Sequence, residues 1–330
     1  MLVLIKRIIK KVFRIERARN KQWFCFDERQ FWKQSSSLSK DKKTRDEAWI
    51  VIQYHIIEKG LTMPNRRLAF GKPVVLNLIA VINAYYKEWQ SFPQQVYHAI
   101  GVIKAYYTLH ETEGYDFGDD VPFWNSIREF VGQYSNVQNS VQKKATYEEF
   151  YANCDSSFPL FAQSRHTLRH YSDAIIPKNK IVESVRLAMT APSACNRQGV
   201  RVHCIANRDL ARRILEVQGG NRGFGDKADK ILIVTSDLSV EMGGRERNAP
   251  YVNGGIFLMN LCYALHYNKI AHCILSCSIE LERLAKIRKM ASISEKEVIV
   301  AMLSCGIAPE SFDIASSPRK EVEDILSYKE

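Results

Sequence analysis

The 330-residue sequence lacks the cysteine pairs that mark the common metal and redox sites. None of its eight cysteines belongs to a CxxC pair, and several lie inside apolar runs, where a thiol acts as a small hydrophobic group. Cys273 and Cys277 stand four residues apart, but no second pair accompanies them. We therefore predict no metal site and a reducing compartment.

Long apolar runs are also missing. No stretch reaches the roughly 18 apolar residues that a membrane-spanning helix needs. The N-terminus has neither the uncharged segment nor the small-residue cleavage site of a secretory signal peptide. No GxSxG motif for a nucleophilic serine occurs. Because 46% of the residues are hydrophobic, the chain can bury a core, and we expect a globular, cytoplasmic protein.

The net charge of +11 is concentrated at the N-terminus, where residues 1–50 hold 14 Lys/Arg and 6 Asp/Glu. Apolar residues follow helical spacing there, namely Leu2, Ile5, Ile9 and Val12, with Lys and Arg between them. Residues 1–15 are predicted to form a basic amphipathic helix that either packs on the protein itself or contacts an anionic membrane at its inner face. Beyond this helix the positive and negative charges are nearly balanced, and the sequence contains no recognised nucleic-acid-binding motif. We therefore expect no nucleic-acid binding.

The pattern along the chain predicts three segments. Residues 1–45 read as the basic helix and a Ser/Lys-rich linker, and residues 46–155 as a helical region with aromatic residues at helical intervals. From residue 156 to 330 helical and strand patterns alternate, which indicates a mixed helix and strand domain. Four strands are expected there, in "VRVHCIAN", "ADKILIVTSD", "IAHCILSC" and "KEVIVAMLSCGIA", and a final helix over 316–326.

A polar loop comes directly before the first of these strands. Pro192 is expected to end the preceding helix, and Ser193, Asn196 and Gln198 offer short hydrogen-bonding side chains. Loops beside strands commonly hold ligands because backbone donors there are free of the ladder. A connection from helix to strand needs polar residues in any case. The loop by itself therefore fits either a ligand site or an ordinary polar connection.

Two further clusters carry polar and positive side chains. "SRHTLRHYSD" places Arg165, His166, Thr167 and Arg169 within five residues, which suits a phosphate but is also typical of a solvated basic turn. "GGNRGFGD", residues 219–226, comes before a strand, so the nicotinamide-dinucleotide pattern of strand, glycines and helix is not met.

Taken together and in this order, these motifs, "NGGIFLMNLCYALHYNKIA" and "SPRKEVEDIL" resemble the flavin-dependent nitroreductase family over about residues 160–330. The resemblance implies an α+β fold, with a central mixed or antiparallel sheet flanked by helices. It also implies an interlocked homodimer with FMN at the interface, preceded here by a long helical N-terminal region.

The resemblance also implies roles for individual residues. Arg165, Thr167 and Arg319 would contact the FMN phosphate, and His166 would lie near the ribityl chain. Arg169 and Asn221 would face the pyrimidine edge of the flavin. A cation such as Arg169 there would stabilise the negative charge of the reduced ring. Contact with the ring and ribityl group would come from the loop, through Pro192, Ser193, Asn196 and Gln198.

Two positions depart from the family pattern. Gly199-Val200 stands where many members have Pro-Trp, which would change how the ring packs. Where relatives supply a backbone donor near flavin N5, this chain has "ILSCSI", so the N–H of Ser276 or Cys277 would take that part.

The resemblance predicts an FMN-dependent oxidoreductase without a catalytic side chain, in which NAD(P)H and then a nitro, quinone or enone compound react by a ping-pong mechanism. The alternative is a catalytically degenerate flavin-binding scaffold that acts as a peripheral membrane or polysaccharide-biosynthesis partner. Residues 55–71 look like a segment of longer nitroreductase-like proteins with surface-polysaccharide functions. Within it, His55 and Glu58 share one helical face, as a structural hydrogen-bonded pair or as groups sharing a proton or metal.

Overall fold

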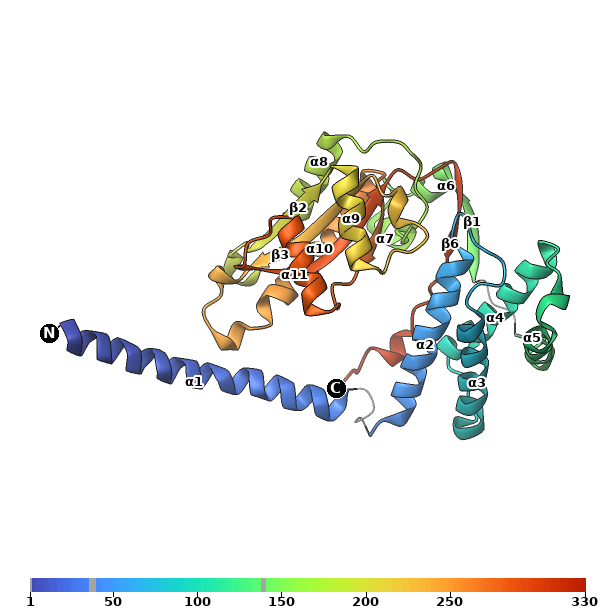
Figure 1. Cartoon of the computed structure of the whole chain (residues 1–330), viewed down its shortest axis with the longest axis horizontal. Coiled ribbons are helices and arrows are strands. Elements are labelled where there is room, and N and C mark those ends of the chain that lie inside the picture. Colours follow the sequence, from blue (N-terminus) through green and yellow to red (C-terminus); the bar gives the residue numbers. More distant parts are fainter. Residues whose placement is uncertain (1, 36–39, 138–140) are drawn as a thin grey trace. The chain divides into compact units, whose positions relative to one another are not determined.

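The computed structural model describes residues 2–35, 40–137 and 141–330, and it describes the side chains of residues 17, 18 and 20 onward within these ranges. The chain forms two compact units (Figure 1). The sheet unit comprises Met1–Lys40, Tyr151–Arg165 and Tyr171–Ile307. The helical unit comprises Asp41–Phe150, His166–His170 and Ala308–Glu330. Each unit is therefore built from three separate stretches of chain, unlike the three contiguous segments expected from sequence.

The sheet unit contains a four-stranded antiparallel sheet in the order β2-β3-β5-β4. Its strands coincide with the four predicted ones: β2 (Val200–Ile205), β3 (Lys230–Asp237), β4 (Ala271–Leu275) and β5 (Glu297–Gly306). β3 is buried along nearly its whole length, because it lies between β2 and β5 and is covered on both faces. This accounts for its unbroken apolar run "ILIV".

Helices cover both faces of this sheet (Figure 1). Leu232 and Val234 of β3 share one core with Phe257 and Leu261, which belong to a long apolar helix packed against the sheet. Ile231 and Ile233 point to the opposite face, where another helix contacts β2 and β3. The α-helices of the unit beyond the N-terminal one are α7 (Phe158–Ser164), α8 (Lys178–Ala188), α9 (Arg208–Gln218), α10 (Ala249–Tyr267) and α11 (Leu281–Met290). The α+β class predicted from sequence is confirmed.

The N-terminal helix α1 spans Leu2–Gln34 and belongs to the sheet unit. Its described part contacts the turn around η6 (Gly244–Glu246). The Asn20 side chain accepts a hydrogen bond from the Gly244 amide at 3.2 Å, and Asp27 pairs with Arg247. The predicted apolar stripe of residues 1–15 lies outside the side chains that the structure describes.

The core of the helical unit is formed by four of its described helices. They are α2 (Lys42–Leu61), α3 (Lys72–Trp89), α4 (Gln94–Thr112) and α5 (Val121–Gln133). Buried side chains from all four form one core, among them Ile57, Leu78, Ile103 and Trp124. Most of the aromatic residues noted in the sequence, such as Tyr54, Tyr85 and Tyr106, are buried in this core rather than forming an exposed stacking surface.

Two strands of the helical unit were not predicted. β1 (Gln142–Thr146) pairs antiparallel with β6 (Ser311–Ala315), and the short helix α6 (Tyr147–Tyr151) follows β1. The predicted final helix over 316–326 is wrong: the structure has only the 3-10 turn η7 (Val322–Asp324) there. Residues 316–318 instead continue from β6 and bond to α2 and α4, which leaves no intrahelical partners for their backbone groups.

Candidate functional site

The predicted site residues divide between the two units. The sheet unit holds Arg165, Pro192, Ser193, Asn196, Gln198, Asn221, Ser276 and Cys277. The helical unit holds His166, Thr167, Arg169 and Arg319. The two groups are described separately, and the convergence of Arg165 with Arg319 on one phosphate stays a prediction.

The loop before β2 has an unusual backbone. Cys195, Asn196 and Gln198 all lie in the left-handed region, with φ angles of 52°, 55° and 51°. Each non-glycine residue in this region costs energy, of the order of 1 kcal/mol, so such a cluster persists only where the surroundings fix it. Backbone strain of this kind is enriched at ligand sites.

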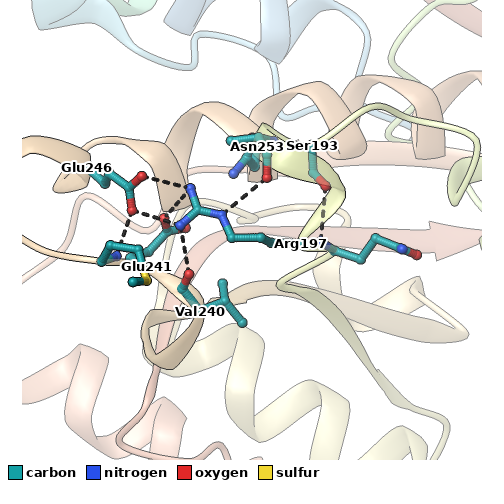
Figure 2. A network of polar contacts seen from close by, with 9 residues as sticks. Ser193, Arg197, Val240, Glu241, Glu246 and Asn253 are labelled. Atoms are coloured by element: carbon teal, nitrogen blue, oxygen red, sulfur yellow. Dashed lines mark hydrogen bonds and ion pairs between the residues drawn. The ribbon is translucent and has the colours of Figure 1, made fainter.

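Arg197, whose role was not predicted, makes most of the hydrogen bonds that hold the loop (Figure 2). Its Nη1 donates to the Val240 carbonyl at 2.8 Å and to Glu246 Oε2 at 2.7 Å, and Nη2 donates to Glu246 Oε1 at 3.1 Å. Its Nε donates to the Ala194 carbonyl at 3.2 Å. A guanidinium held in this bidentate way joins the loop to the turn at residues 240–246.

Two further side chains hold the loop from within the unit (Figure 2). Asn253 of α10 accepts a hydrogen bond from the Ala194 amide at 3.1 Å, and Ser193 Oγ accepts one from the Gln198 amide at 3.0 Å. Ser193 therefore shapes the loop. By contrast, the side-chain amide of Asn196 makes no hydrogen bond to any described residue, so it is available to a ligand.

The charges around Arg197 are strongly coupled. The hydrogen bonds from Arg197 and from the Met242 amide hold the pKa of Glu246 at about 2. Burial raises the pKa of the neighbouring Glu241, and the charge of Arg197, whose Nη2 lies 3.2 Å from Glu241 Oε2, only partly offsets this. Arg197 thus remains neutralised by the carboxylate of Glu246, and its positive charge is not free to bind an anion.

A groove of about 740 Å³ adjoins the loop. Its lining continues from Pro192, Ser193 and Gln198 onto α8, β2 and the first half of α10, and it is predominantly apolar. A volume of this size lies within the roughly 300–1,000 Å³ typical of small-molecule sites. The polar loop predicted from sequence therefore borders an apolar space, which is the arrangement that a flat ring with polar edges requires.

Asn221 is engaged in the structure of its own turn. Its Nδ2 donates to the Leu215 carbonyl at 2.6 Å and to Gln218 Oε1 at 3.0 Å, and it is buried. The segment follows Gly219, which ends α9 in the left-handed conformation. A contact of Asn221 with a pyrimidine edge stays a prediction.

The segment after β4 offers unpaired backbone donors. Within the described part of the chain, the amides of Ser276 and Cys277 make no hydrogen bond, whereas the Ser276 carbonyl accepts one from Gln218 Nε2 at 2.9 Å. Burial raises the pKa of the Cys277 thiol to about 11. A thiol in this state is protonated at neutral pH, so any part that Cys277 plays goes through its backbone.

Arg165 caps α7 and makes no side-chain hydrogen bond or ion pair with the residues described. Its charge still acts on its surroundings: the pKa of His272 is lowered to about 4, mainly by burial and to a lesser extent by Arg165, while the bond from the His272 ring to the Ile270 carbonyl opposes this. Arg165 is therefore a free cation in a partly buried position.

In the helical unit, the segment carrying Arg319 is fixed by one buried carboxylate. Glu58 accepts a hydrogen bond from the Ser317 amide at 3.2 Å and pairs with His98 Nε2 at 2.9 Å. Gln95 Nε2 donates to the Pro318 carbonyl at 3.2 Å. The guanidinium of Arg319 is exposed and donates to the Ser317 carbonyl, so most of its N–H groups face solvent.

His55 also approaches Glu58, with 3.6 Å between Nδ1 and Oε2. Burial alone would raise the pKa of Glu58, but the bonds from His55, His98 and the Ser317 amide outweigh it and hold the pKa at about 2. No group of three or more His, Cys, Asp or Glu suited to a metal ion occurs among the described residues. The two interpretations given for His55 and Glu58 stay predictions.

Comparisons with known proteins agree with the sequence motifs. Residues 162–221 match the model of the Nitroreductase family. This segment contains all the predicted cofactor-binding residues except Arg319. The similarity to the nitroreductase family therefore lies in the C-terminal half of the chain, after the helical region.

Several solved structures are similar to about half of the chain. A Nitroreductase Family Protein from Streptococcus pneumoniae TIGR4 is 15% identical with a TM-score of 0.47, over 52% of this chain and all of that one. NfrA2 of B. megaterium is 17% identical with a TM-score of 0.45, over 51% and 74%. An FMN-dependent Nitroreductase from Clostridium difficile R20291 is 15% identical with a TM-score of 0.41, over 51% and 94%. No curated protein matches the chain significantly.

Proposed function

We propose that this chain, whose C-terminal half carries a nitroreductase family segment, is an FMN-dependent oxidoreductase. In this proposal NAD(P)H reduces the flavin, and a nitro, quinone or enone compound then reoxidises it in the same site. The observation that carries the proposal is the strained, clamped loop of residues 192–198 at the wall of a 740 Å³ apolar groove. Bound FMN would supply the redox chemistry, since none of the side chains at this groove forms a nucleophile and base pair.

The donor set of the chain fits FMN. The free amide of Asn196, together with the Gln198 side chain, would hold the polar edge of the ring. The unpaired N–H groups of Ser276 and Cys277 would orient the ring where it exchanges electrons. Arg165 is a cation without a protein partner, and in this proposal Thr167, Arg319 and the nearby His166 complete the phosphate site, while Arg169 serves the pyrimidine edge.

The apolar walls of the groove would exclude water around the reacting edge. The side chains of the loop would align the second substrate rather than react with it.

A spectrum of the purified protein tests this function. We expect flavin absorbance in the visible range, bleaching on addition of NADH or NADPH, and recovery of the absorbance on addition of a nitroaromatic or quinone. Initial rates at several concentrations of both substrates should give the parallel double-reciprocal lines of a ping-pong mechanism. Protein that shows neither bound flavin nor reductase activity after FMN is added would contradict the proposal.

We further propose that the protein works as a homodimer. α10 is apolar around its circumference, and one of its sides is buried. Its other side exposes several large side chains, namely Tyr251, Val252, Ile256 and Met259. A helix of this kind is normally covered on all sides. Sedimentation analysis should give twice the chain mass of 38.0 kDa, and Ile256→Glu should shift the protein to the monomer.

A second candidate function is that of a flavin-binding scaffold at a membrane or in polysaccharide biosynthesis. It is favoured by the exposed aromatic residues of α1, which include Phe24, Phe31 and Trp32. None of the helices described is long and apolar enough to cross a membrane, so such a contact would be peripheral, at the inner face.

Removal of residues 1–15 combined with the substitutions Phe24→Ser, Phe31→Ser and Trp32→Ser tests this scaffold, because Asn20 and Asp27 of the docked part of α1 are retained. If the scaffold interpretation holds, binding to anionic vesicles should be lost while the flavin stays bound and turnover is absent. Unchanged binding to vesicles would contradict it.

A further inference from the structure

The groove beside the loop carries an unusual distribution of charge. From α8, Val182, Val185, Arg186 and Met189 line it, at the i, i+3, i+4 and i+7 spacing of a single helical face. Arg186 thus interrupts a stripe that is otherwise apolar. β2 also contributes to the lining, with Val200, Val202 and a second arginine, Arg201, which stands between the two valines in the chain.

Neither arginine is neutralised by a direct ion pair. Arg186 has no hydrogen bond or ion pair within the described parts of the chain. Arg201 donates from Nη1 to the carbonyls of Gln198 and Val200, both at 3.0 Å, and these bonds hold its side chain at the groove. The charge of Asp237 interacts with Arg201, but the Asp237 carboxylate accepts hydrogen bonds from the Ser239 amide and hydroxyl and makes no bond to the arginine.

The groove is also free of acidic side chains. Its polar lining beyond the two arginines consists of neutral groups, such as Ser193, Gln198 and Asn253. Glu183, which stands one helical turn before Arg186 on α8, pairs with Lys180 at 3.3 Å. An apolar space bordered by two arginines that form no ion pair with a described residue favours a flat ligand that carries negative charge.

We propose that this groove selects a planar aromatic acceptor bearing a carboxylate, with Arg201 and Arg186 as the residues that determine this specificity. The inference rests on the proposed function for the reduction of the acceptor, but the binding preference is independent of turnover. The aromatic ring would lie between the valines of α8 and β2, and the carboxylate would accept from the free N–H groups of Arg201, with Arg186 adding a second charge.

A matched pair of acceptors tests the proposal in the full-length, FMN-supplemented protein. 4-Nitrobenzoate and 4-nitrobenzamide share the ring and the reducible group and differ in charge. We expect kcat/KM to favour the benzoate, and the double substitution Arg186→Gln/Arg201→Gln to lower kcat/KM for the benzoate about tenfold while changing it for the benzamide less than about twofold. Arg213→Gln on α9, an exposed arginine outside the groove, is the control and should change neither value.

Binding of unreactive benzoate, followed by ligand-observed NMR with benzamide as the reference, gives a readout without turnover. Benzoate binding that is lost in the double variant supports the inference even if the protein proves to have no reductase activity, in which case only the proposed function fails. Equal binding and equal kcat/KM for the charged and neutral compounds, or values unaffected by the double substitution, would overturn the inference and leave the reductase function intact.

Discussion

A glutamate fixes a polar segment in each unit, but the two glutamates lie in different surroundings. Glu246 of the sheet unit is 32% exposed and binds the loop through Arg197. Glu58 of the helical unit is 1% exposed, binds the Ser317 amide directly and is hydrogen-bonded to His98. Both segments contain left-handed residues, Asn196 in one and Ser317 in the other. The difference indicates that the loop is held locally and the C-terminal segment by the core itself.

Loss of the buried carboxylate should have the largest effect. Glu58→Ala removes the buried carboxylate that bonds to His98 and accepts from the Ser317 amide, and we expect it to lower the free energy of unfolding of the helical unit by about 3–5 kcal/mol. Urea denaturation followed by circular dichroism measures this, and hydrogen exchange assigns the loss to α2 and α4. Glu129→Ala on α5, an exposed glutamate, should cost less than about 0.5 kcal/mol. A cost for Glu58→Ala as small as that of the control would show that the buried pair does not hold the unit.

Acid should lower the free energy of unfolding of the helical unit by somewhat less than Glu58→Ala does, because it protonates Glu58 without removing the side chain. The pKa of Glu58 is lowered on folding from 4.5 to about 2, so its contribution is complete above pH 4.5 and is lost as the pH falls through about 2. The shift corresponds to roughly 3 kcal/mol. Glu246 titrates in the same range, so the stability difference between wild type and Glu58→Gln at each pH isolates Glu58. A difference that stays constant from pH 6 to 2 would contradict this assignment.

Breaking the exposed clamp should change ligand binding more than stability. Arg197→Gln removes the bonds to Glu246 and Val240, which releases the strained loop, and on the proposed function we expect FMN affinity to fall about tenfold. Titration with FMN fluorescence measures the affinity, with Arg213→Gln as the matched control. Faster hydrogen exchange in the loop should accompany the loss. Normal FMN affinity with a loosened loop would show that the loop backbone does not hold the flavin.

The smallest effect should come from the attachment of α1. Asp27 and Arg247 form a partly exposed ion pair beside Trp23, whose ring lies 5.6 Å from the Arg247 guanidinium. We expect Asp27→Asn to weaken this contact only slightly, and to have less effect at high salt. Hydrogen exchange of residues 20–27 reports the opening of this contact. If exchange over residues 20–27 is unchanged, the ion pair adds nothing to the attachment of α1.

The extent to which the sequence predicts this structure depends on the range of the interactions. The four strands of the main sheet and the helices α2 to α4 were predictable because each carries its own apolar period. β1 and β6 were not, since "QKKAT" and "SFDIA" become strands only through a partner far away in the chain. The same holds for residues 316–326, whose helical pattern yields to hydrogen bonds with Glu58 and Gln95.

The candidate site shows the same limit. Ser193, Asn196 and Gln198 could be found from their types and their place before a strand. Arg197 stands among them with a side chain that looked no different, but its partners Val240 and Glu246 lie more than 40 residues away. Arg197 is recognised only by its contacts with the distant acids Glu241 and Glu246. The spacing of residues in the sequence does not reveal such contacts.

The pairing of Gln142 with Ala315 in β1 and β6 has a consequence for how the chain is made. During synthesis the helices α2 to α5 leave the ribosome long before β6. Until residues 311–317 have been added, β1 has no strand to pair with and Glu58 cannot bond to the Ser317 amide. The backbone of β1 therefore stays unpaired while residues 151–307 of the sheet unit are synthesised. A chaperone that shields unpaired strand edges would act in this interval. No single cut of the polypeptide would release either half as a finished domain.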